Sequence, residues 1–145
     1  MKGISILGST GSIGTQALDV VRENRDKFVV KALSCGRNIE LMKAQISEFE
    51  PQLVVTETAD DAKLLRAYFK DKTRNIEFAY GEEGLLELAR YDADLLLNSL
   101  SGMRGMLPTY EAIKARRNIA LANKESLVAG GGVIMSSAAE MGVKI

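Results

Sequence analysis

Short apolar runs alternate along the chain with longer stretches in which apolar residues recur every three or four positions. Most short runs are bounded by glycine, proline, serine or asparagine, and their length and flanks favour buried strands over helices. The longer stretches have the spacing of helices that turn one apolar face towards a core. The pattern therefore predicts alternating strands (residues 3–8, 28–33, 53–55, 76–80, 95–97 and 119–122) and helices (residues 12–24, 38–49, 59–70, 82–90, 107–116 and 126–141).

Local signals mark several of these boundaries. Asn38 can cap the second helix, and Pro51 stops it. Pro108 lies near the first turn of the fifth helix, where proline is tolerated. The three glycines at residues 130–132 are expected to break or loosen the last helix, and residues 143–145 are expected to begin a further strand.

The predicted strands are apolar throughout rather than alternating, which indicates a parallel sheet covered on both faces. A chain of 145 residues has the length of one domain. The fold class is therefore α/β: a Rossmann-like, doubly wound, mostly parallel sheet with helices on both faces, spanning residues 1–145.

The composition narrows the possible partners. The 19 Lys and Arg residues balance 19 Asp and Glu residues, which argues against a nucleic-acid or anionic-membrane partner. The chain contains no histidine, the commonest general base and metal ligand. Its single cysteine, Cys35, excludes an intrachain disulfide and fits a reducing, cytoplasmic setting; we interpret it as a small buried residue. No stretch approaches the ~18 apolar residues of a membrane helix.

Three glycines separate the first strand from the first helix: Gly8, Gly11 and Gly14, in the pattern G-x-x-G-x-x-G. Glycines at such a junction allow a tight turn and let a pyrophosphate approach the backbone, while the helix N-terminus supplies free N–H groups. Hydroxyls between the glycines can add further donors. The alternative is that these glycines only permit a tight turn, although a turn alone does not need three of them.

The end of the second strand indicates which dinucleotide is bound. NAD-binding domains carry an acidic residue there for the ribose hydroxyl. Here Arg37 takes its place, and a guanidinium matches a 2′-phosphate in charge and geometry. This favours NADP over NAD, the alternative being that Arg37 is a solvated loop charge.

Two later strands end in asparagine, Asn98 and Asn123, at the edge where open α/β sheets bind ligands. Asn123 and the nearby Glu125 also suit local capping of the last helix, so their role stays open. Lys124 is different, because a cation in the first turn of a helix opposes the helix dipole. An anionic ligand, such as a phosphate, would compensate it.

Together these segments resemble one enzyme family, 1-deoxy-D-xylulose 5-phosphate reductoisomerase. The resemblance rests on residues 8–14, residues 36–38 and the run Leu-Ala-Asn-Lys-Glu-Ser-Leu-Val at 121–128, in the same order and spacing. It covers the whole chain as the family's N-terminal NADPH-binding domain. The resemblance implies conversion of that sugar phosphate to 2-C-methyl-D-erythritol 4-phosphate in non-mevalonate isoprenoid synthesis, by a homodimer that uses NADPH and a divalent cation, magnesium or manganese.

The resemblance also implies roles for individual residues. NADPH would be held by Thr10, Gly11, Ser12 and Ile13 at its phosphates, by Gly36, Arg37 and Asn38 at the adenosine ribose phosphate, and by Asn123 and Glu125 from another strand end. Lys124 would reach the substrate.

The family's metal-binding Asp-Ser-Glu segment follows a strand that would begin at Val143, whereas this sequence stops at Ile145. The resemblance therefore implies that metal ligands, a functional histidine and a lid belong to later sequence, and that this chain alone is inactive. Two alternatives stay open: the cofactor domain of another NADP-dependent oxidoreductase, and a nucleotide-sensing domain that is not an enzyme.

Overall fold

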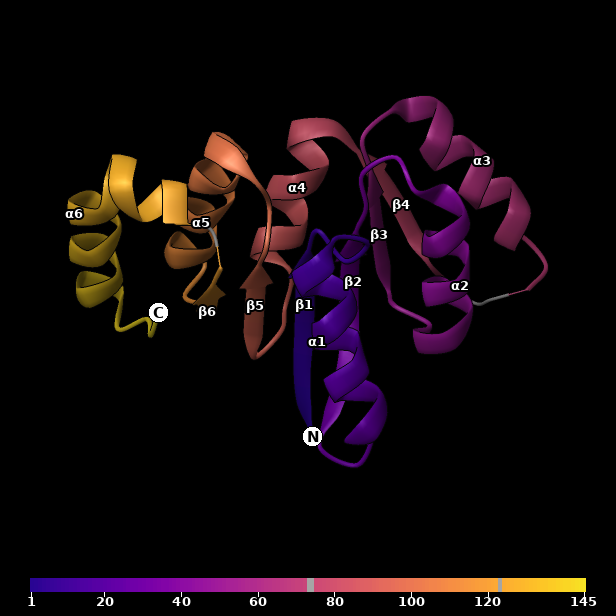
Figure 1. The fold of residues 1–145 in the computed structure, drawn as a ribbon, viewed down its shortest axis with the longest axis horizontal. Helices are drawn as coiled ribbons and strands as arrows, with labels where there is room; N and C mark the ends of the chain where they lie inside the picture. The colour runs from indigo at the N-terminus through magenta and orange to yellow at the C-terminus, as the bar shows by residue number, and fades with distance from the viewer. Residues whose placement is uncertain (73–74, 123) are drawn as a thin grey trace.

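A parallel sheet organises the chain. The computed structural model describes residues 1–72, 75–122 and 124–145, and for residues 102, 103, 124–130 and 133 it describes the backbone alone. Within these ranges the sheet contains β1 (Lys2–Leu7), β2 (Phe28–Ser34), β3 (Leu53–Thr56), β4 (Glu77–Tyr80), β5 (Leu95–Asn98) and β6 (Asn118–Leu121). The strand order is β4-β3-β2-β1-β5-β6, and every neighbouring pair is parallel (Figure 1).

The order reverses at β1, which pairs with β2 on one side and β5 on the other. The chain first builds the sheet outwards from β1 to β4, and then returns to add β5 and β6 on the opposite side of β1. The loops after β1 and β5 therefore diverge, and such a reversal opens a crevice beyond the carboxyl ends of the strands. This is the edge where ligands bind in doubly wound folds.

Helices cover both faces of the sheet. One face packs against α1 (Ser12–Glu23), α2 (Ile39–Phe49) and α3 (Ala59–Phe69), and the other against α4 (Gly81–Arg90), α5 (Met106–Lys114) and α6 (Lys124–Met141). Along β1, Ile6 joins the first apolar cluster and Leu7 the second, and both are fully buried. This double burial explains why the strands read as unbroken apolar runs, and it confirms the predicted fold class.

The predicted elements agree with the observed ones to within one or two residues at most ends, and the exceptions lie near the C-terminal end. Residues 143–145 do not form the predicted strand. The Lys144 carbonyl accepts a hydrogen bond from the Ile119 amide (2.8 Å), but the Lys144 amide donates to the Asn118 side chain (3.0 Å). A side chain thus replaces the backbone partner that a regular ladder would need.

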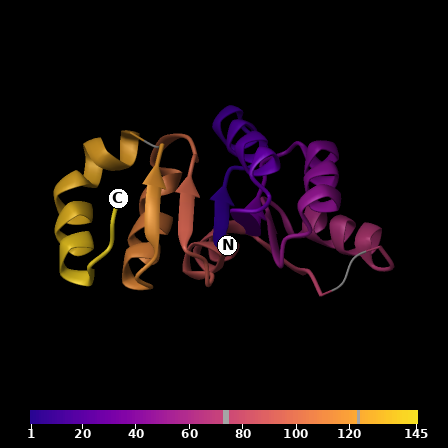
Figure 2. The same cartoon turned by 90° about the horizontal axis from the view of Figure 1, so that it is seen from below.

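The predicted break in the last helix is not observed. α6 begins at Lys124 and runs through the three glycines as a single element, although its ribbon curves along its length (Figure 2). Added Cβ atoms on Gly131 and Gly132 would meet nothing within 4 Å, so packing does not require glycine at these two positions. In the described part of the chain, no helix is both long and apolar enough to cross a membrane.

Candidate functional site

The glycine motif spans the loop between β1 and α1 and the first turn of α1, at the carboxyl edge of the sheet, and its three glycines serve different purposes. Gly8 adopts a positive φ of 85°, which favours glycine. A Cβ on Gly14 would lie 2.1 Å from the Gly8 carbonyl oxygen, so the first turn of α1 can approach the loop only without a side chain. A Cβ on Gly11 would meet the same oxygen at 3.6 Å, an ordinary contact. Protein packing therefore explains Gly8 and Gly14 but does not require a glycine at position 11.

A buried polar cluster holds this loop from below. The Ser9 hydroxyl is fully buried and lies 2.7 Å from Oε1 of Gln45 in α2, to which it donates. Nε2 of Gln45 donates in return to the Ser9 carbonyl (2.9 Å), and the Gly8 amide donates to the Ser34 hydroxyl (2.9 Å). Ser9 therefore faces the interior and supplies no donor to a ligand, contrary to the expectation for the hydroxyls of this loop.

The next four residues face outwards. Thr10 is half-buried, and Gly11, Ser12 and Ile13 are exposed, where α1 begins. Gly11 is the N-cap residue, and among the described residues no side chain caps this end of the helix. The N–H groups of a helix's first turn lack partners within the helix and carry positive potential, so this end of α1 can bind an anion.

The segment after β2 carries the second predicted group of residues, next to the same edge. Asn38 caps α2, because its side chain accepts a hydrogen bond from the Leu41 amide (3.1 Å). The Arg37 side chain is 95% exposed, and its Nε lies 3.8 Å from Oε2 of Glu57. Arg37 is thus a solvent-facing cation at the predicted position, and Asn38 has a local structural role beside any role in binding.

A cleft of about 340 Å³ opens between these carboxyl ends and the segment that follows β5. Its walls come from the ends of β2 and β3, the first turns of α4, the 3-10 turn η1 (Gly102–Gly105) and the start of α5. The lining includes the apolar residues Leu85, Leu107 and Pro108 and the charged residues Glu57, Glu82 and Arg104. An apolar cleft with a few charged groups is typical of a small-molecule site.

Two residues of this cleft, Glu57 and Arg104, were missed by sequence reasoning. Glu57 directly follows β3, so the same strand-end reasoning that selected Asn98 and Asn123 could have found it. Arg104 follows β5 by six positions within a turn, and no pattern in the sequence marks it.

Cys35 forms part of the cleft wall and is buried, as predicted. Burial, reinforced by the negative charges of Asp61 and Glu57, raises the pKa of its thiol to about 12. A thiol with such a pKa is protonated at neutral pH and is a poor nucleophile. Its role at the site is to fill space.

Asn98 serves the local fold rather than a ligand. It is fully buried, and its Nδ2 donates to the Gly105 carbonyl (2.9 Å) and to the Thr109 hydroxyl (2.7 Å). Its Oδ1 accepts from the Leu100 amide (3.3 Å). These bonds fix the path of η1 and thus the place from which Arg104 projects.

The last group of predicted site residues stays untested by the geometry. Asn123 lies outside the described residues. Lys124 and Glu125 stand in the first turn of α6, but their side chains are also outside what the structure describes. Their assigned roles therefore remain predictions.

Comparison with known proteins identifies the family. The sequence model described as 1-deoxy-D-xylulose 5-phosphate reductoisomerase matches residues 4–131. This chain belongs to that family. The 1-deoxy-D-xylulose 5-phosphate reductoisomerase of Shouchella clausii (strain KSM-K16) is 51% identical over 146 residues, which cover all of this chain and 38% of that protein. The chain thus spans less than two fifths of this curated relative.

Solved structures of the family share the fold. The reductoisomerase from Zymomonas mobilis in complex with NADPH has a TM-score of 0.91 at 31% identity, over 99% of this chain and 37% of that one. A DOX-P reductoisomerase in complex with NADPH, fosmidomycin and magnesium has a TM-score of 0.92 at 30% identity, over 99% and 35%. Family membership confirms the resemblance and disfavours a different class of NADP-dependent oxidoreductase.

Proposed function

We propose that this chain is the NADPH-binding domain of an enzyme that converts 1-deoxy-D-xylulose 5-phosphate to 2-C-methyl-D-erythritol 4-phosphate. The observation that carries the proposal is the shared position of two anion-binding features. The N-terminus of α1, which no described side chain caps, and the exposed Arg37 both lie at the carboxyl edge, after the adjacent strands β1 and β2. NADPH offers two anionic groups, a pyrophosphate and a 2′-phosphate, which suit these two features.

The chain's own residues fit the pyrophosphate half of this cofactor. The absence of a side chain at Gly11 lets the pyrophosphate approach the backbone closely, although the packing of the protein does not require a glycine there. The helix N-terminus beside it, with Thr10, Ser12 and Ile13, then supplies donors to the pyrophosphate. The Ser9–Gln45 cluster holds this loop in place before any ligand arrives.

At the other end of the cofactor, Gly36, Arg37 and Asn38 would hold the 2′-phosphate and its ribose. Bound NADPH supplies the hydride that reduces the aldehyde formed by rearrangement of the substrate. The residues of this chain bind and orient the cofactor for that step.

We propose the roles of the remaining residues, the cation and the assembly from the family to which the chain belongs. Asn123 and Glu125 would contact NADPH from the strand end after β6, and Lys124 would contact the substrate phosphorylated sugar. The related structure that contains magnesium supports a divalent cation, magnesium or manganese, in the whole enzyme. We propose that the ligands of this cation belong to the part of the family's sequence that this chain does not span, since the chain covers 38% of its relative from Shouchella clausii. We also propose a homodimer in the cytoplasm, with a small-molecule substrate rather than a nucleic acid or a membrane as partner.

Titration of the chain with NADPH and with NADH tests the proposal. Wild-type protein should bind NADPH more tightly, and Arg37→Ala should weaken NADPH binding by about tenfold or more while changing NADH binding by less than about twofold. Arg90→Ala removes an arginine from the C-terminal end of α4 and is the matched control. Equal losses for both cofactors in Arg37→Ala would argue against a 2′-phosphate contact. The chain alone, given substrate, NADPH and Mg²⁺, should not oxidise NADPH, and turnover would contradict its assignment as a cofactor domain.

A further inference from the structure

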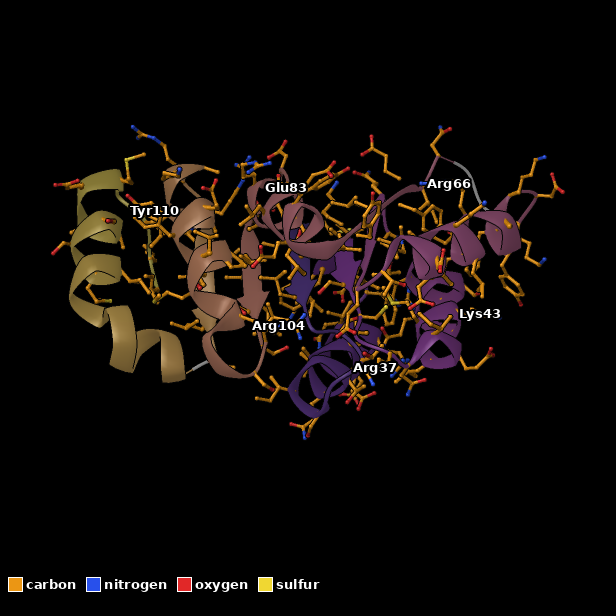
Figure 3. All side chains as sticks on the ribbon, turned by 90° about the horizontal axis from the view of Figure 1, so that it is seen from above. Arg37, Lys43, Arg66, Glu83, Arg104 and Tyr110 are labelled. Carbon is orange, nitrogen blue, oxygen red and sulfur yellow. The ribbon has the colours of Figure 1, made fainter. Side chains whose placement is uncertain are left out.

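The Glu57 carboxylate lies between two arginines at the mouth of the cleft. Its Oε2 is 3.8 Å from Nε of Arg37, and its Oε1 is 3.7 Å from NH1 of Arg104. Figure 3 looks onto the carboxyl ends of the strands and labels Arg37 and Arg104, which lie near each other on this edge. A single carboxylate thus gathers two guanidinium groups into one place.

The two arginines reach this place from different strands. Arg37 follows β2 and Arg104 follows β5, and these strands flank β1, whose end carries the glycine loop. Arg104 stands on the η1 turn that Asn98 fixes from inside the fold. Its backbone position is therefore set by a buried network, not by the ion pair with Glu57.

Both arginines retain the capacity to bind a ligand. Their distances to Glu57 exceed the ~2.7–2.9 Å of a charge-assisted hydrogen bond, so the ion pairs hold the guanidinium groups without saturating their N–H donors. The Arg104 side chain is 56% exposed, and it also lines the cleft. The two guanidinium groups thus share the Glu57 carboxylate at the mouth of the cleft, whose lining also contains the carboxylate of Glu82.

We propose that Arg104 is a second specificity-determining residue, which with Arg37 clamps the 2′-phosphate of NADPH. The inference rests on the proposed function, since it names a further residue of the same site. A phosphate monoester carries about −1.5 to −2 charges at neutral pH and three acceptor oxygens, more than one guanidinium can match. A second guanidinium, held by the same carboxylate and from the opposite side of β1, supplies the remaining charge and donors.

The experiment compares wild-type chain with Arg104→Ala, Arg104→Gln, Arg37→Ala and the double variant, and uses Arg90→Ala as the control. NADPH, NADH, 2′-AMP and 5′-AMP are the probes, and binding is measured by calorimetry after thermal melting has shown that each variant is folded. Arg104→Ala and Arg104→Gln should each weaken the binding of NADPH and 2′-AMP by about tenfold and change the affinity for NADH and 5′-AMP by less than about twofold. In the double variant the preference for the 2′-phosphate should disappear.

The outcomes separate the two proposals. One outcome is that Arg37→Ala loses affinity for NADPH alone, while both Arg104 variants lose affinity equally for NADPH and NADH or keep both affinities. In either case Arg104 is only a cation paired with Glu57, and this inference is overturned. If wild-type chain does not distinguish 2′-AMP from 5′-AMP, the proposed NADPH site itself fails.

Discussion

Ser9 and Gln45 bind each other through two hydrogen bonds, although they lie 36 positions apart in the sequence. The Ser9 hydroxyl donates to the Gln45 amide oxygen, and the Gln45 amide nitrogen donates to the Ser9 carbonyl. Both side chains are buried, so water cannot replace either bond. The pair ties the loop that opens α1 to the helix that follows β2, and so joins the two segments that carry the proposed anion-binding residues.

Gln45→Leu should lower the free energy of unfolding by about 2 kcal/mol, because it removes the donor to the buried Ser9 carbonyl and leaves the Ser9 hydroxyl with the Ser34 carbonyl (3.0 Å) as its oxygen acceptor. It should weaken the binding of NADPH and of NADH to the same extent, since it loosens the glycine loop but does not change the residues that contact the 2′-phosphate. Urea denaturation and cofactor titration measure the two effects. Gln16→Leu places the same change at an exposed position of α1 and should cost little. Similar costs for the two variants would show that the buried pair does not stabilise the loop.

Alanine at Gly14 and at Gly11 should have opposite effects. Gly14→Ala drives a Cβ to 2.1 Å from the Gly8 carbonyl oxygen, and the backbone shift it forces should cost about 3 kcal/mol or prevent folding. Gly11→Ala meets only an ordinary contact at 3.6 Å, with φ at −81°, so the fold should be kept. It should still weaken both NADPH and NADH, because the methyl group stands where the pyrophosphate approaches. Unchanged binding by a folded Gly11→Ala protein would contradict this path.

The sequence could predict those features of the fold and the site that depend on nearby residues. The inner strands β1 and β3 were found because burial on both faces makes them almost wholly apolar. The α2 cap was found because Asn38 bonds to a backbone amide within its own turn. Such signals are local. The inward orientation of Ser9 could not be read from the loop, because Gln45 reaches it from another helix.

Long-range geometry also explains what was missed at the site. Arg104 can be recognised as a candidate site residue only in the folded chain, where η1 brings it next to Glu57 at the end of β3. The prediction of a strand at residues 143–145 was wrong for a similar reason. The Lys144 amide donates to the Asn118 side chain instead of to the backbone of β6. Asn98 follows an apolar run as a ligand-binding residue would, yet its polar atoms bond within the protein.

Cys35 should resist thiol reagents until the pH is high. Burial raises the pKa of its thiol to about 12, so only about one molecule in ten thousand carries the thiolate at pH 8. The rate of reaction with a disulfide reagent should rise about tenfold with each pH unit above 8, and urea should abolish the protection. A rate that levels off near pH 9 in the folded protein would contradict the raised pKa.

The same shift has a consequence for stability. The unfolded thiol ionises near pH 9 while the folded thiol keeps its proton up to about pH 12. The contribution of Cys35 to the free energy of unfolding is therefore complete below pH 9 and is lost as the pH rises from 9 to 12. Cys35→Ala protein, which lacks this group, should show a smaller loss of stability over that interval.

Glu57→Gln should strengthen the binding of NADPH and 2′-AMP by about two- to fivefold and leave NADH and 5′-AMP unchanged. The substitution keeps the size of the side chain and removes the negative charge that faces both Arg37 and Arg104. Asn98 already fixes the η1 turn, so the backbone position of Arg104 does not depend on the ion pair. The gain should shrink as the salt concentration rises, because an exposed electrostatic effect is screened.

Glu111→Gln removes a carboxylate that pairs with Arg90 instead, and it should not change the affinity for either cofactor. A selective loss of NADPH affinity in Glu57→Gln would show that the carboxylate orients the arginines more than it competes with the phosphate. In that case the two arginines would need Glu57 to form the clamp, and the buried Asn98 network would not be sufficient to position Arg104.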